Sequence, residues 1–172
     1  VGEYKDGQHH GYGSMSFPNG EIYEGEWKFG KRDGQGTNIW KNGSKYVGGF
    51  SNGLRHGNGK EILSTGSRYE GEYRNNQFHG YGKYFHMTGE TYTGEWKFGK
   101  RNGKGTNIWP NKMKYSGEFL NNKRHGNGIL THSDGRKTSG IWKNDVIFKK
   151  LELKPFINKA WIGVRIKQLT KE

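Results

Sequence analysis

Four of the seven histidines occupy one position of a recurring pattern, so acid–base or metal chemistry is the first hypothesis to test. They are His10, His56, His79 and His125, and the same position holds Asp33 and Asn102 in other copies. A position that accepts His, Asp and Asn suits a hydrogen bond at a turn or strand end better than catalysis. In a stack of hairpins, like positions are about 10 Å apart, too far to share one ion. We therefore interpret these histidines as structural.

A column of glutamates is the second candidate for chemistry, as a set of paired carboxylates. It consists of Glu3, Glu26, Glu72, Glu95 and Glu118. Alternation with rings and glycines predicts that it lies on an outward face, where we expect cross-strand ion pairs with Lys and Arg.

Other catalytic patterns are missing from the sequence. It has no cysteine, no serine in a G-x-S-x-G motif, and no helical pattern after its G-x-G pairs. The sequence therefore predicts a protein that is not an enzyme and that uses no metal or cofactor.

The recurring pattern has a period of 23 residues, marked by Tyr23, Tyr46, Tyr69, Tyr92 and Tyr115. A glycine follows each tyrosine by two positions, an aromatic residue by four, and a G-x-G pair by eleven and thirteen. A longer period lies on top, because residues 25–32 recur as residues 94–101. Three units are therefore duplicated together, and the two halves of the protein should present similar surfaces.

The composition limits the kind of core that the chain can build. Only 29% of the 172 residues are hydrophobic, whereas 15% are aromatic and 30 residues are glycine. So few aliphatic side chains cannot fill one thick core, but rings could supply the buried area of a thin, repetitive fold. The net charge of +13 favours acidic partners such as phospholipid head groups, RNA or acidic protein surfaces.

Each unit has the pattern of a β-hairpin. Residues 23–27 alternate between a ring or glycine and a charge, which is typical of a strand with one buried face. Residues 29–33 are then predicted to form a polar turn, and residues 34–40 a second strand. Asn42-Gly43 is predicted to form a tight two-residue turn into the next unit. We expect the fifth unit to distort this turn, because it has Asn111-Lys112 instead.

The pattern resembles the MORN (membrane occupation and recognition nexus) repeat. Tyr23, Gly25, Trp27, Gly30, Lys31, Gly34 and Gly36 carry the resemblance, together with their equivalents in other units. The resemblance implies an all-β fold, an elongated single-sheet solenoid of stacked antiparallel hairpins. About six units start near residues 1, 23, 46, 69, 92 and 115, and a partial unit starts near 138. It also implies a scaffold in a cytoskeletal, ciliary or membrane-proximal assembly.

A basic column is the first candidate binding surface. It contains Lys31, Arg32, Arg55, Lys100, Arg101, Lys123 and Arg124. Because all of them fall in the predicted turn, we expect them to line one edge of the rod. This edge either keeps the protein soluble and protected or binds anions such as membrane lipids.

Aromatic residues near the end of the second strand are the other candidate surface. Phe17, Trp40 and Trp109 share one position with Leu63, His86 and His132. A position that tolerates His is expected to be partly buried. These rings form either part of the core or the floor of a peptide-binding groove.

The last segment, residues 146–172, leaves the pattern and is predicted to cap the stack or dock elsewhere. Residues 162–169 fit a strand or a helix equally well, so the type stays open. The chain begins with Val1 in mid-repeat, which suggests a fragment of a longer protein. No signal peptide or transmembrane segment is predicted, and a cytoplasmic location is expected.

Three hypotheses for function remain. The first is a scaffold that binds proteins through its groove, its edge or end-to-end homodimerisation of the open sheet ends. The second is a peripheral phosphoinositide-binding module, with nucleic acid a less favoured ligand. The third is a regulatory segment of a larger enzyme.

Overall fold

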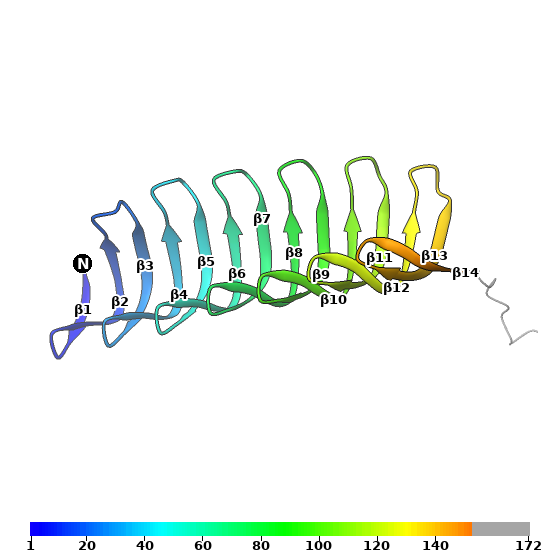
Figure 1. Cartoon of the computed structure of the whole chain (residues 1–172). Coiled ribbons are helices and arrows are strands. Elements are labelled where there is room, and N and C mark those ends of the chain that lie inside the picture. The colour runs from blue at the N-terminus through cyan, green and yellow to red at the C-terminus, as the bar shows by residue number, and fades with distance from the viewer. Residues whose placement is uncertain (153–172) are drawn as a thin grey trace, which may run out of the picture.

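The computed structural model describes residues 1–152, which form one open antiparallel sheet whose strand order follows the sequence (Figure 1). The predicted all-β stack of hairpins is therefore confirmed. The strands are β1 (Gly2–Lys5), β2 (Gln8–Ser16), β3 (Ile22–Lys28), β4 (Lys31–Ile39), β5 (Lys45–Ser51), β6 (Leu54–Ile62), β7 (Arg68–Arg74), β8 (Gln77–Phe85), β9 (Thr91–Lys97), β10 (Lys100–Ile108), β11 (Lys114–Leu120), β12 (Lys123–Thr131), β13 (Lys137–Lys143) and β14 (Val146–Leu151).

The two-residue turns lie at the opposite end of each hairpin from the predicted one. They are Asp6-Gly7, Phe29-Gly30, Asn52-Gly53, Asn75-Asn76, Phe98-Gly99, Asn121-Asn122 and Asn144-Asp145, and both residues of every turn have positive φ. Two successive left-handed residues define the type I′ turn, which matches the twist of paired strands. We call this row of turns, along the lower side of Figure 1, the tip edge. The turn predicted at residues 29–33 was too long, because β4 already begins at Lys31.

Asn42-Gly43, for which the tight turn was predicted, belongs instead to a wider loop, and such loops follow one another along the other edge, which we call the loop edge. In the second unit, Trp40 N–H donates to the Ser44 carbonyl and Gly43 N–H donates to the Trp40 carbonyl, each at 2.9 Å. In the fifth unit, Lys112 takes the place of that glycine at φ +67° and makes the same 2.9 Å bond to Trp109. The predicted distortion of this loop was therefore wrong: the lysine adopts the glycine conformation.

A buried tyrosine holds each hairpin together. The Tyr23 ring is 0% exposed and its hydroxyl donates to the Glu26 carbonyl at 2.9 Å. A Cβ added to Gly36 would overlap the Tyr23 hydroxyl, and one added to Gly25 would lie 2.6 Å from it. The glycine pair therefore makes room for a ring of its own hairpin.

The core is a single row of rings that runs the length of the rod. Tyr23 packs edge-to-face on Trp27 of its own unit at 5.0 Å and on Phe50 of the next unit at 5.2 Å between ring centroids. The same alternation continues through each unit to Tyr115 and Trp142. Edge-to-face pairs are favourable beyond the area that they bury. This unbroken row is how a chain poor in aliphatic residues obtains a core.

The glutamate column does not form the predicted ion pairs with lysines and arginines. Glu26 accepts a hydrogen bond from the backbone N–H of Gln35 at 2.6 Å, and Glu95 accepts one from Lys104 N–H at 2.9 Å. Each bond sits beside a register shift, such as that between Gly25 and Trp27, where the ladder is interrupted. The carboxylates therefore satisfy amide groups that the bulge leaves without a strand partner.

The sheet continues past residue 145, because β14 pairs with β13 and ends at Leu151. The rest of the predicted cap, including the ambiguous stretch 162–169, lies outside the described residues. Between residues 1 and 152 there is no helix of the length and apolarity needed to cross a membrane.

Because the tyrosines are buried, the stability of the fold should change with pH in the alkaline range. Burial raises the pKa of Tyr23, Tyr46 and Tyr115 from 10.0 to about 12. Between these values the folded state holds protons that the unfolded state releases, so the free energy of unfolding falls as pH rises through this window. We expect the tyrosinate absorbance and the loss of strand circular dichroism to rise together between pH 10 and 12. Tyrosinate formation with the strand signal intact would contradict this prediction.

The strained loop of the fifth unit offers a stabilising substitution. Lys112→Gly restores the residue that other units place at positive φ, and an L-residue there costs about 1–2 kcal/mol. We expect the midpoint of urea unfolding to rise with an unchanged denaturant slope. Lys114→Gly, in the adjoining strand β11, is the control and should lower the midpoint.

Candidate functional site

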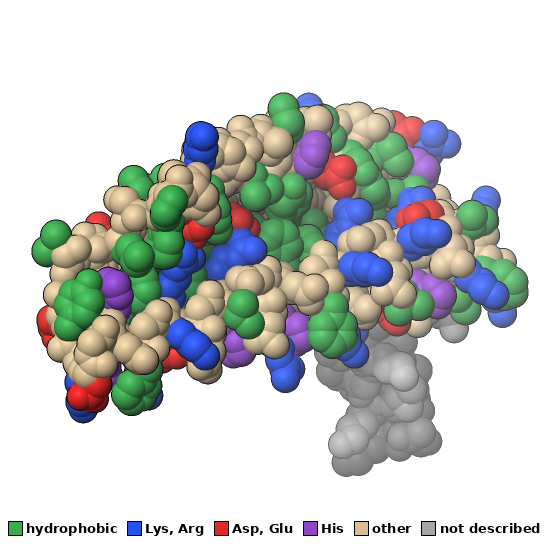
Figure 2. All heavy atoms as spheres, turned by 60° about the vertical axis from the view of Figure 1, so that its left-hand side comes forward, with side chains coloured by type: hydrophobic (Ala, Val, Ile, Leu, Met, Phe, Trp, Pro, Cys, Tyr) green, Lys and Arg blue, Asp and Glu red, His purple; other side chains and the backbone are tan. Residues whose placement is uncertain are grey.

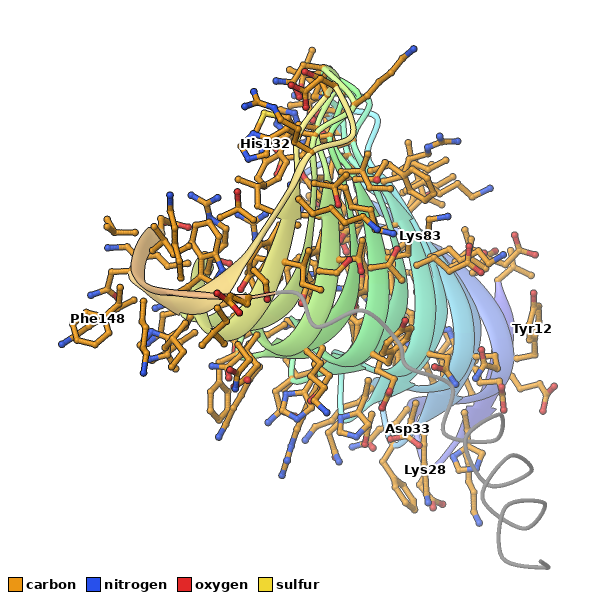
Figure 3. All side chains as sticks on the ribbon, turned by 90° about the vertical axis from the view of Figure 1, so that its right-hand side faces the viewer. Tyr12, Lys28, Asp33, Lys83, His132 and Phe148 are labelled. Carbon is orange, nitrogen blue, oxygen red and sulfur yellow. The ribbon has the colours of Figure 1, made fainter. Side chains whose placement is uncertain are left out.

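The hairpins bend, and their inner face forms a groove along the rod (Figures 2 and 3). In Figure 3, viewed along the rod, the loop-edge halves converge near His132, while the tip-edge halves fan out between Lys28 and Phe148. Tyr12 and Lys83 point away from the groove on the outer face. Figure 2 looks towards the groove, where hydrophobic and basic side chains lie between two rims.

The arginines of the basic column lie inside this groove and not on an exposed turn, which corrects the prediction for them. Arg32 is the second residue of β4, so strand alternation points it to the same face as Gly36 and Asn38. Its guanidinium carbon lies 4.9 Å from the Phe17 ring centroid and 5.1 Å from that of Tyr23. Arg55, Arg101 and Arg124 lie over rings in the same way, at 4.5–6.0 Å.

Three of the arginines each bond to a side chain six residues further along the same strand. Arg32 Nη1 donates to Asn38 Oδ1 at 2.8 Å, and Arg101 Nη1 repeats this bond to Asn107 Oδ1 at 2.8 Å. Arg55 forms an ion pair with the buried Glu61. Sequence reasoning missed these partners, although an even spacing within a strand places two side chains on one face.

Further acidic groups complete the charge balance of the groove. Glu21 pairs with Arg32 at 2.7 Å, Glu90 pairs with Arg101 at 3.1 Å, and Asp145 pairs with Arg124 at 3.2 Å. The four arginines are therefore used within the fold as charged lids over the aromatic row. They do not form a free anion-binding ridge.

The fourth unit breaks this arrangement and opens a pocket. Phe78 occupies the arginine position and stacks on Tyr69, with ring centroids 3.7 Å apart and planes 10° apart. Tyr84 occupies the position of the Asn or Glu partner. Without a guanidinium across the groove, a cavity of about 430 Å³ remains. Its lining is Leu63, Phe78, Tyr84, His86, Glu90, Tyr92, Trp96, Gly99, Arg101 and Asn122.

The predicted groove aromatics lie on the loop-edge side of the same groove. Phe17, Trp40 and Trp109 are all half-buried and pack against the core. Leu63, from the same column, lines the pocket, and so does the exposed His86. The column thus belongs partly to the core and partly to the wall of the groove. Its smaller side chains, Leu63 and His86, lie at the pocket.

The lysines of the basic column behave differently from the arginines. Lys31, Lys100 and Lys123 are exposed at the tip edge, because each precedes its arginine by one residue and points to the other face. In the histidine column, Asp33 makes the expected hydrogen bond, accepting from Asn52 N–H at 3.0 Å. His10 instead packs against the Phe29 ring at 5.5 Å.

Loss of an inner arginine should destabilise the fold, contrary to what a turn position would imply. Arg55→Ser leaves the Glu61 carboxylate, whose side chain is only 8% exposed, without its ion pair. Breaking a buried pair typically costs about 3 kcal/mol or more. We expect Arg55→Ser to lower the free energy of unfolding by about that amount, whereas the exposed control Lys31→Ser changes it by less than about 0.5 kcal/mol. Equal effects of the two variants in urea titrations would contradict this assignment.

The matches to solved structures are distant. One is the TCP domain of SAS-4 (dCPAP) of Drosophila melanogaster with a proline-rich motif of Ana2 (dSTIL), at TM-score 0.43 and 13% identity, covering 75% of this chain and 63% of that one. Another is the TCP10 domain of Danio rerio CPAP with a STIL peptide, at TM-score 0.41 and 12% identity, covering 76% and 54%. The present chain thus spans less than two thirds of either. Comparison with curated proteins found no match.

A family model settles the classification. The MORN repeat model matches six times, at residues 1–22, 23–45, 46–68, 69–90, 92–114 and 115–135. These matches follow the tyrosine-to-tyrosine units of the structure and cover most of the chain. The protein belongs to the MORN repeat family.

Proposed function

We propose that this repeat module is a non-catalytic scaffold that binds an extended segment of a partner protein in its groove. The observation that carries the proposal is the pocket of the fourth unit. It interrupts the row formed by Arg32, Arg55, Arg101 and Arg124, and the rings of Phe78, Tyr84 and Trp96 line it. Ring-lined pockets of about 300–1,000 Å³ with a few polar groups are typical of ligand sites.

The polar groups of the pocket fit a peptide better than a small apolar molecule. Arg101 and Glu90 lie on one side and can exchange hydrogen bonds with a peptide backbone, and Asn122 offers an amide. Units repeat about every 10 Å along the groove, which equals about three residues of an extended chain. A ligand lying along the rod would therefore place one large apolar anchor side chain in the pocket and lighter contacts over the neighbouring units.

The resemblance to MORN scaffolds supports this class of function and the expectation of a cytoskeletal, ciliary or membrane-proximal assembly. A regulatory role beside an enzyme uses the same groove chemistry, with the ligand on the neighbouring domain.

The chain itself supplies the variant that tests the pocket. Phe78→Arg with Tyr84→Asn gives the fourth unit the Arg–Asn pair that Arg32 and Asn38 form in the second. The new guanidinium should close the pocket with the fold intact. Peptides selected from a displayed library against the wild-type protein should lose affinity for this variant by about 30-fold or more, as for a central interface residue. Fluorescence anisotropy with one selected peptide measures the change.

The matched control is Tyr81→Asn, which removes an exposed ring of the same unit from the outer face. It should bind the selected peptide as the wild type does, and circular dichroism should show both variants folded. If the folded pocket-closing variant retains full affinity, the pocket is not the binding site.

A further inference from the structure

The outer face of the sheet carries a continuous row of side chains that the aromatic core does not use. We call it the outer row. It has one residue at the loop-edge end of each strand from β3 to β13, and each residue is the direct cross-strand partner of the next. Lys83, on the same strand as Phe85 of the row, marks this face in Figure 3. The row consists of Ile22, Ile39, Lys45, Ile62, Arg68, Phe85, Thr91, Ile108, Lys114, Thr131 and Lys137.

The aliphatic side chains of the outer row stay exposed to solvent. Ile39, Ile62 and Ile108 are 38%, 50% and 42% exposed. Thr91 and Thr131 hold the same position in β9 and β12, and threonine forms strands well, so the sheet does not require isoleucine there. Single exposed apolar residues are common, but a contiguous series of them is typical of a binding surface.

Basic side chains separate the apolar ones along the outer row. Lys45, Arg68, Lys114 and Lys137 lie on four of the odd-numbered strands, and the row has no acidic member. Within residues 1–152 these four side chains take part in no ion pair. The positive charge of the row is therefore uncompensated, unlike that of the inner arginines. A partner with acidic and apolar side chains in alternation complements it.

A hollow lies in the middle of the outer row. It has a volume of about 310 Å³, and Ile62, Arg68 and Phe85 contribute to its lining. The Arg68 guanidinium carbon is 5.1 Å from the centroid of the Phe85 ring. Glu70 also lines the hollow, but its carboxylate pairs with Lys60 at 2.9 Å. The hollow thus offers apolar walls beside a guanidinium, which suits an apolar side chain next to a carboxylate.

The geometry points to an acidic, extended segment of a partner protein: we propose that the outer row binds such a segment lying along the rod, with an apolar side chain at every third residue. The apolar members Ile39, Ile62, Phe85 and Ile108 lie on alternate strands, about 9.6 Å apart at the usual strand spacing. A polyproline II segment rises about 9.3 Å per turn of three residues, so every third side chain faces the row in step with these strands. A β-strand would instead point every third side chain to alternating sides. Acidic segments also favour extended conformations because their charges repel one another.

The shape of this face favours a linear chain over a bilayer. The outer face is convex across the strands, because the hairpins bend around the groove (Figure 3). A flat bilayer would meet a convex face along a narrow strip only, whereas a linear segment can follow the whole row. The groove and its pocket are not needed for this contact, so the proposal is independent of the groove ligand.

The test compares two fluorescein-labelled peptides of identical composition on the full chain. One peptide repeats Ile-Glu-Glu, and the other has its isoleucines at irregular spacings. Fluorescence anisotropy should show that the wild type binds the regular peptide about tenfold more tightly, because only that peptide buries all its isoleucines on the row. The triple variant Ile39→Thr, Ile62→Thr and Ile108→Thr should lose this preference while circular dichroism shows the sheet intact.

Further variants separate charge from apolar contact. Replacing Lys45, Arg68 and Lys114 by Ser should weaken binding of both peptides by about threefold for each cation removed, and added salt should mimic the change. The matched control, Leu54→Thr with Leu120→Thr, removes apolar side chains of similar exposure (39% and 42%) from the tip edge. This control and the pocket-closing variant described above should both bind the regular peptide as the wild type does.

Four results would overturn the proposal. The wild type binds neither acidic peptide, it binds both equally well, or the folded threonine variant keeps the full preference for the regular peptide. In the fourth, the isoleucines are needed for sedimentation with phosphatidylserine vesicles but not for the peptides, which would assign the outer row to a membrane.

Discussion

The structure depends on one contact, a tyrosine ring lying across two glycines of its own hairpin. In all five complete units the tyrosine hydroxyl also donates to the backbone carbonyl three residues on, at 2.9–3.1 Å. The missing Cβ atoms let the ring lie directly on the backbone, and the ring then meets aromatic residues on both sides. A sheet only one ring thick can thus bury enough area to fold with few aliphatic residues.

This constraint leaves other positions of the inner face free to vary. In the second to fifth units, the arginine position and the position six residues on hold Arg with Asn, Arg with Glu, or Phe with Tyr. In the sixth unit that second position is Leu130, and Arg124 pairs with Asp145 instead. The first two combinations close the groove with a charged lid, and the third leaves it open. The aromatic core therefore determines the shape of the rod. The residues at two inner positions of one strand determine where the groove contains a pocket.

The sequence predicted the sheet, the period and the ring columns, because each rests on a regular spacing. It misplaced the arginines because the turn was assigned to residues 29–33, which hid the alternation of Lys31 and Arg32 in β4. The tight turn was predicted at Asn42-Gly43, yet it lies at Phe29-Gly30, where Phe29 adopts the left-handed conformation that Asn was expected to supply. The pocket could not be predicted, since a cavity depends on which neighbouring side chains fail to fill the groove.

Neighbouring basic residues consequently serve different surfaces. Lys31 faces solvent at the tip edge, while Arg32 lies over Phe17 and Tyr23 within the groove. The second unit is largely retained in the fifth: the tip sequence of residues 27–32 recurs as residues 96–101, and the inner Arg32–Asn38 pair recurs as Arg101–Asn107. The first and fourth units differ at the inner position, which is His9 in the first and Phe78 in the fourth. The pocket beside Phe78 therefore arises where one duplicated unit has diverged on its inner face.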